Sequence, residues 1–166
     1  MKKLKYLIVF LVAILLAGGC SFNEEESNNK QYSDNGFSIT LPSDFYKKDL
    51  ASVTVYYESE YAIVTALKES FTTLETVGLN SNSSIEDYAK AVIKNNKQDD
   101  ADLQLSEDGN FAYFVYEKEV SGKEFYYTAV VYKAADAFWL VNFACEDKNK
   151  EEYSEKFIDW ASTVEV

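Results

Sequence analysis

The sequence contains no histidine and no arginine. Histidine is the usual general base near neutral pH and the most common metal ligand, and the arginine guanidinium binds carboxylates and phosphates through two parallel hydrogen bonds. Their absence excludes Ser-His-Asp and Cys-His catalysis, zinc sites with histidine ligands and arginine clamps for anions. The chain also lacks a Gly-x-Ser-x-Gly motif, a phosphate-binding loop and a dinucleotide-binding glycine motif. We therefore predict no catalytic, no cofactor-binding and no metal-binding residues.

Long apolar runs are scarce, and the clearest one lies at the N-terminus. Lys2, Lys3 and Lys5 precede an unbroken apolar segment of twelve residues, 6–17. A helix that spans a membrane needs about 20 apolar residues. Positive charge, a short apolar segment and small residues in this order are typical of a secretory signal peptide, which is favoured over a transmembrane helix.

The small residues Ala17-Gly18-Gly19 end at Cys20, and this segment resembles the lipobox of bacterial lipoproteins. Ala17 stands where leucine is more common. The resemblance implies cleavage before Cys20 and a diacylglyceryl group on its thiol, and two acyl chains are enough for stable membrane anchoring. We expect residues 1–19 to be a lipoprotein signal peptide and Cys20 to be the lipidation site. The alternative is an ordinary signal peptide cut near Gly19.

These features predict a chain anchored by lipid on the extracytoplasmic face of the cell membrane. Lysine as the sole basic residue suggests a low-GC genome and hence a Gram-positive host. Cys145 would be the only remaining thiol, so no internal disulfide can form. It follows an apolar run and precedes two acids, which indicates a buried residue at a strand end rather than a reactive thiol.

The formal net charge is −12. Removal of residues 1–19 would take away three of the lysines and no acid, so the mature chain would be still more acidic. Such a surface repels nucleic acid and anionic lipid headgroups. Residues 20–31 are polar and acidic and are predicted to be a lipidated cysteine followed by a flexible tether. Residues 32–166 are long enough for one domain with its own core.

Alternating apolar and polar residues predict strands, and apolar residues spaced by three and four predict helices. Ser83-Ser84-Ile85-Glu86 reads as a capping box at a helix start, and Asn149 as the cap of a last helix. Ser121-Gly122-Lys123 reads as a turn between two strands. The predicted strands are 37–41, 51–57, 61–67, 111–118, 125–133 and 138–145, and the helices follow Ser83 and Asn149. Together they predict an α+β fold in which an antiparallel sheet packs against two or more amphipathic helices.

The order of these elements, with the stretches 36–42, 84–89 and 138–143, resembles the PsbP/Mog1/DcrB-like superfamily over residues 32–166. The resemblance implies an antiparallel sheet between helices and a binding or assembly role rather than catalysis. It transfers no catalytic residue, and metal-binding histidines described for some members have no counterpart in this chain.

Two alternatives to a protein-binding role remain open. The high aromatic content, 16% with 13 tyrosines, fits a small-ligand or glycan site formed by exposed rings. A pair of carboxylates facing each other across a cleft would allow a hydrolase, which is the least favoured. The acids at 99–102 and 107–108 invite a calcium interpretation but do not match an EF-hand, because the required glycine and closing glutamate are missing. We expect a protein partner of unknown identity and no binding of nucleic acid.

Overall fold

A computed structural model describes residues 29–166; the predicted signal peptide, Cys20 and most of the predicted tether lie outside this range. The described chain forms nine strands, three α-helices and two short 3-10 helices. No helix in this range is long and apolar enough to cross a membrane. The elements are β1 (Asn29–Asp34), β2 (Phe37–Pro42), β3 (Tyr46–Lys47), β4 (Val55–Glu58), β5 (Ala62–Ser70), α1 (Phe71–Leu74), η1 (Glu75–Val77), α2 (Ile85–Asn95), β6 (Gln104–Leu105), β7 (Ala112–Val120), β8 (Lys123–Lys133), β9 (Ala137–Glu146), η2 (Asp147–Asn149) and α3 (Lys150–Ala161).

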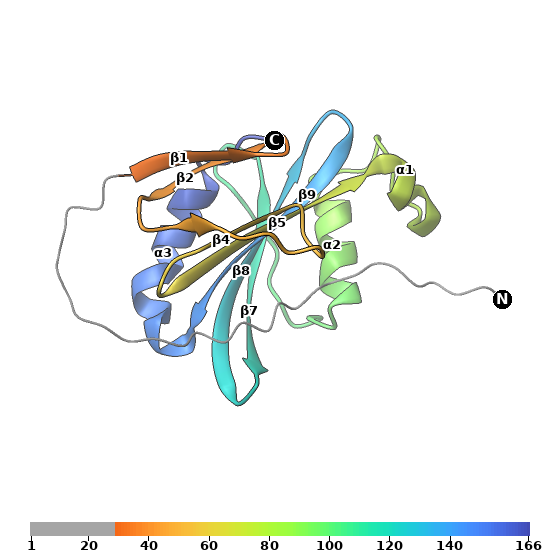
Figure 1. Ribbon diagram of the computed structural model, residues 1–166. Coiled ribbons are helices and arrows are strands. Elements are labelled where there is room, and N and C mark those ends of the chain that lie inside the picture. Colours follow the sequence, from red (N-terminus) through yellow and green to blue (C-terminus); the bar gives the residue numbers. More distant parts are fainter. Residues whose placement is uncertain (1–28) are drawn as a thin grey trace.

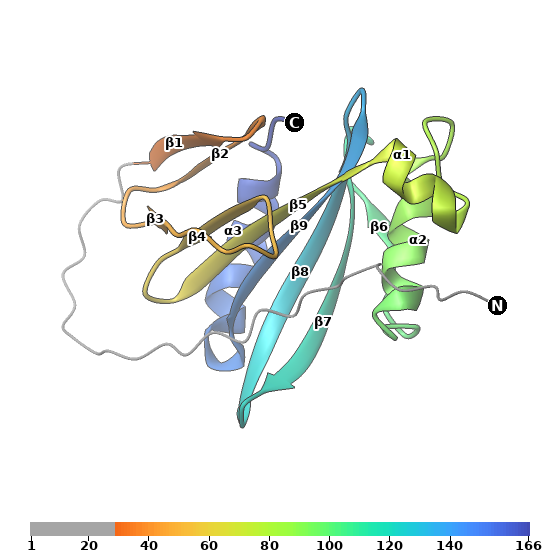
Figure 2. The ribbon, with the colours of Figure 1, turned by 45° about the vertical axis from the view of Figure 1, so that its right-hand side comes forward.

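Seven strands form one antiparallel sheet in the order β3-β4-β5-β9-β8-β7-β6, and β1 pairs with β2 in a separate hairpin. Figures 1 and 2 show α1 and α2 on one face of the large sheet and α3 on the other, with the β1–β2 hairpin beside α3. The predicted α+β fold, an antiparallel sheet between helices, is confirmed.

The two faces of the sheet follow from the alternation of side chains along its central strands. On β9, Phe138 and Leu140 pack toward α2, whereas Trp139 and Val141 pack toward α3. Helix α2 covers its face with the buried side chains Tyr88, Ala89 and Val92. This apolar face has the spacing that the sequence predicts.

The opposite face is covered by α3 and by β2. Phe157, fully buried on α3, lies with its ring centroid 5.6 Å from that of Phe143 on β9. On β2, Phe37 packs against the sheet with its ring centroid 5.7 Å from that of Trp139. Cys145 is also buried here, at the end of β9 as predicted, and burial raises the pKa of its thiol to about 12. This cysteine is therefore a core residue.

Strands β7 and β8 form a long hairpin that projects beyond the rest of the sheet (Figure 2). Val120 pairs with Lys123, and the two residues between them have positive φ, 53° for Ser121 and 81° for Gly122. Two central residues with positive φ are typical of a type I′ turn, whose twist matches that of the flanking strands. The predicted turn is confirmed.

Several predicted boundaries differ from the structure. Strand β4 begins at Val55 rather than Ala51, because the segment before it turns: the amide of Val53 donates to the carbonyl of Leu50. The capping box lies one residue later than expected. Ser84 is the cap, and its partner is Asp87 instead of Glu86, with hydrogen bonds of 3.0 and 2.9 Å. Asn149 precedes α3 as predicted, but its side chain makes no capping hydrogen bond.

Three strands, one α-helix and the two 3-10 helices have no counterpart in the sequence prediction. The two-residue strands β3 and β6 are too short to show alternation, and α1 is a single turn. Strand β1 begins at Asn29, three residues before the expected start of the domain. Its first residues are polar and exposed, and Tyr32 fixes the strand by donating to the carbonyl of Phe45 at 2.8 Å.

Candidate functional site

The predicted lipidation site, Cys20, lies outside the described residues. Within residues 29–166, no group of three or more histidine, cysteine, aspartate or glutamate side chains could hold a metal ion. In the acidic loop before β7, Asp108 uses its carboxylate locally: Oδ1 accepts from the Ser106 hydroxyl at 2.7 Å and from the Asn110 amide at 3.0 Å. This carboxylate serves as a turn-stabilising acceptor.

Glu58, at the end of β4, is a buried carboxylate with only 3% of its surface exposed. The hydroxyl of Tyr56 donates to Oε2 at 2.6 Å, the hydroxyl of Tyr46 donates to Oε1, and the ammonium of Lys48 forms an ion pair with the same oxygen. Burial alone would raise the pKa of Glu58, but these three donors together hold it below its usual value. The group is an ionised structural acceptor.

Glu69, near the end of β5, is the second unusual carboxyl group. Its Oε2 accepts a hydrogen bond from the hydroxyl of Tyr88 on α2. Burial raises the pKa of Glu69 and outweighs the lowering effect of the Tyr88 hydroxyl. A carboxyl group with a raised pKa is a candidate general acid, so its distance from other carboxylates matters.

Glu58 and Glu69 cannot form a catalytic pair. Glu58 stands opposite Ile63 in the β4–β5 register, and Glu69 lies six residues further along β5. Six residues of an extended strand span about 20 Å, whereas the two carboxyl groups of glycosidases lie roughly 5–10 Å apart. Glu58 and Glu69 thus do not support the hydrolase alternative.

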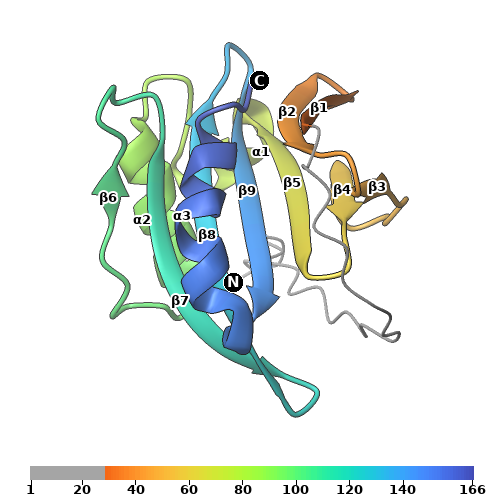
Figure 3. The ribbon, with the colours of Figure 1, turned by 90° about the vertical axis from the view of Figure 1, so that its left-hand side faces the viewer.

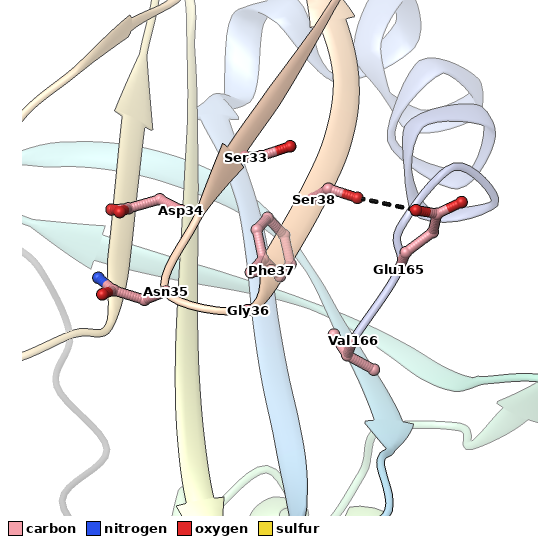
Figure 4. A pocket seen from close by; sticks show the side chains of 8 residues that line it. All are labelled: Ser33, Asp34, Asn35, Gly36, Phe37, Ser38, Glu165 and Val166. Atoms are coloured by element: carbon pink, nitrogen blue, oxygen red, sulfur yellow. Dashed lines mark hydrogen bonds between the residues drawn. The ribbon is translucent and has the colours of Figure 1, made fainter.

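A hollow with a volume of about 480 Å³ lies beside the β1–β2 turn. Figure 4 shows it as an open depression in which Ser38 and Glu165 face each other, joined by a hydrogen bond of 3.1 Å. Phe37 is the aromatic residue among those that line this hollow, and only 1% of its surface is exposed. A smaller hollow of about 210 Å³ adjoins the C-terminal residues. Neither has the set of exposed rings expected of a glycan site.

Most tyrosines of the described chain are core residues. Among residues 29–166, the most exposed tyrosines are Tyr46 and Tyr61, at 49% and 42%. Tyr46 is held by Glu58 on the face that carries α2. Tyr61 lies in the β4–β5 loop, where a hydrogen bond with the neighbouring Glu60 raises the pKa of its hydroxyl. No ring contact joins Tyr46 and Tyr61 in the described part of the chain.

Strand β7 provides a different type of candidate, an open sheet edge. Its neighbour β6 pairs only with Ala112 and Tyr113, while β8 pairs with the whole of β7 (Figure 3). From residue 114 onward, no described strand covers the outer side of β7. Among these residues Val115 is 39% exposed, and the three charged residues after Tyr116 are also exposed. Sequence reasoning found this strand but could not show that it lies at an edge, because β6 has no detectable pattern.

No protein-family model matches the sequence, and no curated protein matches it either. Solved structures show a clear similarity in fold. PsbP (CyanoP) from Synechocystis sp. PCC 6803 has a TM-score of 0.61 at 13% identity, covering 89% of this chain and 98% of its own. The Ran-binding protein Mog1p from Saccharomyces cerevisiae has a TM-score of 0.58 at 7% identity, covering 85% and 96%. The described chain therefore has the same fold as PsbP and Mog1p, as the sequence resemblance implied.

Proposed function

We propose that this PsbP/Mog1-like domain belongs to a lipoprotein of the extracytoplasmic membrane face and that it binds a protein partner without catalysing a reaction. The observation that carries the proposal is the fold: it matches nearly the full length of Mog1p, which is named for binding another protein. The arrangement of the carboxyl groups supports the same interpretation, since Glu69 lies six residues along β5 from Ile63, the residue opposite Glu58.

Anchoring would be supplied by Cys20. If the mature chain begins there, eight residues separate the lipidated cysteine from the start of β1 at Asn29. A segment of this length reaches at most about 30 Å when fully extended. A partner would then be a membrane protein or a protein held close to the membrane.

The anchoring part is tested by the mass of the mature N-terminus. We expect intact-mass spectrometry of the native protein to show a chain that starts at Cys20 and carries acyl groups. The Cys20→Ala variant should be released from the membrane or remain unprocessed, and Cys145→Ala is the matched control that should behave like the wild type. An unmodified N-terminus, or unchanged membrane retention of Cys20→Ala, would contradict the proposal.

The binding part is tested by photo-crosslinking in intact cells. A photoreactive amino acid is placed at one exposed position at a time, at Tyr61, Leu105 or Val115. We expect one protein to be crosslinked from a subset of these positions, which would define a binding face. The control carries the same leader and tether on an unrelated domain. Equal crosslinking from all positions, or the same products from the control, would count against a specific partner.

A further inference from the structure

The outer edge of β7 has unused backbone hydrogen-bonding groups. The carbonyl of Phe111 accepts from the amide of Ser106 on the β6 side. In an antiparallel strand, the amide and carbonyl groups of alternate residues point to the same side. Those of Val115, Glu117 and Glu119 therefore point away from β8, and no described strand pairs with them. This edge can accept an additional strand.

The side chains of the same three residues define the chemistry of the edge. They lie on the α3 face, where Glu117 forms an ion pair with Lys150 of α3. Glu119 stands directly opposite Glu124 on β8, and both side chains are exposed. Like charges placed opposite each other destabilise a sheet, and neither of these two acids has an ion-pair partner among the described residues. A positive side chain from an added strand would relieve this repulsion.

A second copy of the chain fits this edge poorly. If β7 of one copy paired with β7 of a second copy through all three open residues, the two-fold axis would pass through Glu117. Glu117 of one copy would then lie against Glu117 of the other. Moving the axis by one residue toward the hairpin tip places Glu117 against Glu119 instead. Charged residues on an edge strand commonly prevent such self-association. They do not repel a basic strand, and the strongly acidic protein, with a net charge of −12, attracts one.

We propose that the open edge of β7, from Val115 to Glu119, binds an extended and basic segment of a partner protein by addition of a strand to the sheet. Main-chain hydrogen bonds would supply affinity, and lysine or arginine side chains facing Glu119 and Glu124 would supply specificity. This inference rests on the proposed binding function and identifies the surface and the partner chemistry.

The test uses the full lipidated chain in phosphatidylcholine nanodiscs, whose uncharged surface does not attract basic peptides. The probe is a short capped peptide that alternates threonine with lysine, and the control peptide has glutamate in place of lysine. We expect fluorescence anisotropy to show binding of the lysine peptide alone. Hydrogen exchange resolved to single residues should show new protection at the amides of Val115, Glu117 and Glu119.

Two pairs of variants separate charge from strand pairing. The double variant Glu119→Gln/Glu124→Gln should weaken peptide binding about fivefold, as expected for the loss of two exposed ion pairs. The control double variant Glu151→Gln/Glu155→Gln makes the same charge change on α3 and should bind the peptide like the wild type. Glu119→Pro removes an outward amide that Glu119→Gln keeps, and it should bind roughly fivefold more weakly than Glu119→Gln. Melting temperatures confirm that each variant is folded.

Equal binding by Glu119→Pro and Glu119→Gln, or protection elsewhere than on β7, would overturn the strand-addition proposal. A failure of the strand-addition proposal can be distinguished from a failure of the proposed protein-binding function. A partner crosslinked in cells from positions other than Val115, and captured equally well by Glu119→Pro, would refute the edge and leave the protein-binding function standing. Absence of any specific crosslinked partner would refute the binding function.

Discussion

The hydroxyl of Tyr88, on helix α2, donates a hydrogen bond to the carboxylate of Glu69, on strand β5. The Tyr88 side chain is fully buried, and its ring lies parallel to that of Phe138 with the centroids 4.6 Å apart. The contact joins the helix to the sheet through one polar pair inside an apolar layer. It also leaves a carboxylate in a place where burial opposes its ionisation.

Replacement of Tyr88 by phenylalanine should destabilise the domain mainly at neutral pH. The ring and its stacking are kept, but an ionised Glu69 loses its hydrogen-bond donor, which should lower the free energy of unfolding by about 2 kcal/mol at pH 7. At pH 4 the carboxyl group is protonated and the loss should be smaller. Urea unfolding at the two pH values measures both quantities, and equal losses would contradict a role for the Glu69 charge.

Glu69→Gln should remove the destabilisation that ionisation of Glu69 causes as the pH rises. Burial raises the pKa of Glu69 above its ordinary value of 4.5, so the folded state retains a proton that the unfolded state has already released. The stability linked to this proton is fully present below pH 4.5 and is lost as the pH rises through the raised pKa. The variant should therefore gain stability relative to the wild type between pH 4 and pH 7. A constant difference across this range would refute the assignment.

Much of the fold could be predicted because its elements carry regular patterns. The apolar spacing of Tyr88, Ala89 and Val92 defined the buried face of α2, and the turn at Ser121-Gly122 placed β7 beside β8. Such patterns arise because each face of an element is either buried or exposed along several residues. They predict which elements form and which side of each is buried.

The features that lack a local pattern could not be predicted. Whether β7 lies at an edge depends on the two residues of β6, which are far too few to show alternation. The environment of Glu69 depends on Tyr88, which lies 19 positions away on another element. Neither residue stands in a sequence pattern that indicates this contact. The candidate edge site and the hydrogen-bonded carboxyl groups of Glu58 and Glu69 therefore emerge only from the three-dimensional arrangement.

The stability contributed by the hydrogen bond from Tyr56 to Glu58 should depend on pH in the opposite sense to that linked to Glu69, and Tyr56→Phe tests this. The Tyr56 hydroxyl donates at 2.6 Å to Glu58, which is buried and ionised. Loss of this hydrogen bond should cost about 2 kcal/mol at pH 7. Tyr113→Phe is the matched control: its hydroxyl donates to Gln104 at an exposed site, and the cost should be below about 0.5 kcal/mol.

The pH profile of the same variant gives a second measurement. Lys48, Tyr46 and Tyr56 hold the pKa of Glu58 below 4.5 despite its burial. The stability that this group contributes is present above pH 4.5 and is lost as the pH falls through the lowered pKa. The difference between wild type and Tyr56→Phe should therefore shrink on acidification from pH 5 to pH 3. A difference that grows on acidification would show that Glu58 is not ionised in the folded state.

The β7–β8 turn should be improved by a single substitution. Ser121 has a φ of 53°, which a serine adopts at a cost, while the equivalent position of the β1–β2 turn is occupied by Asn35 with a φ of 52°. Asparagine tolerates this conformation, and Asn-Gly is the preferred pair for a type I′ turn.

Ser121→Asn should therefore raise the free energy of unfolding by about 0.5 kcal/mol, and Gly122→Ala, at a φ of 81°, should lower it by about 1 kcal/mol. Asn35→Ser provides the reverse exchange. It should cost more than 0.5 kcal/mol, because the Asn35 side chain also donates to the carbonyl of Thr54 at 3.2 Å. Thermal unfolding measures all three, and a Ser121→Asn variant less stable than the wild type would show that positive φ at this position is not the source of strain.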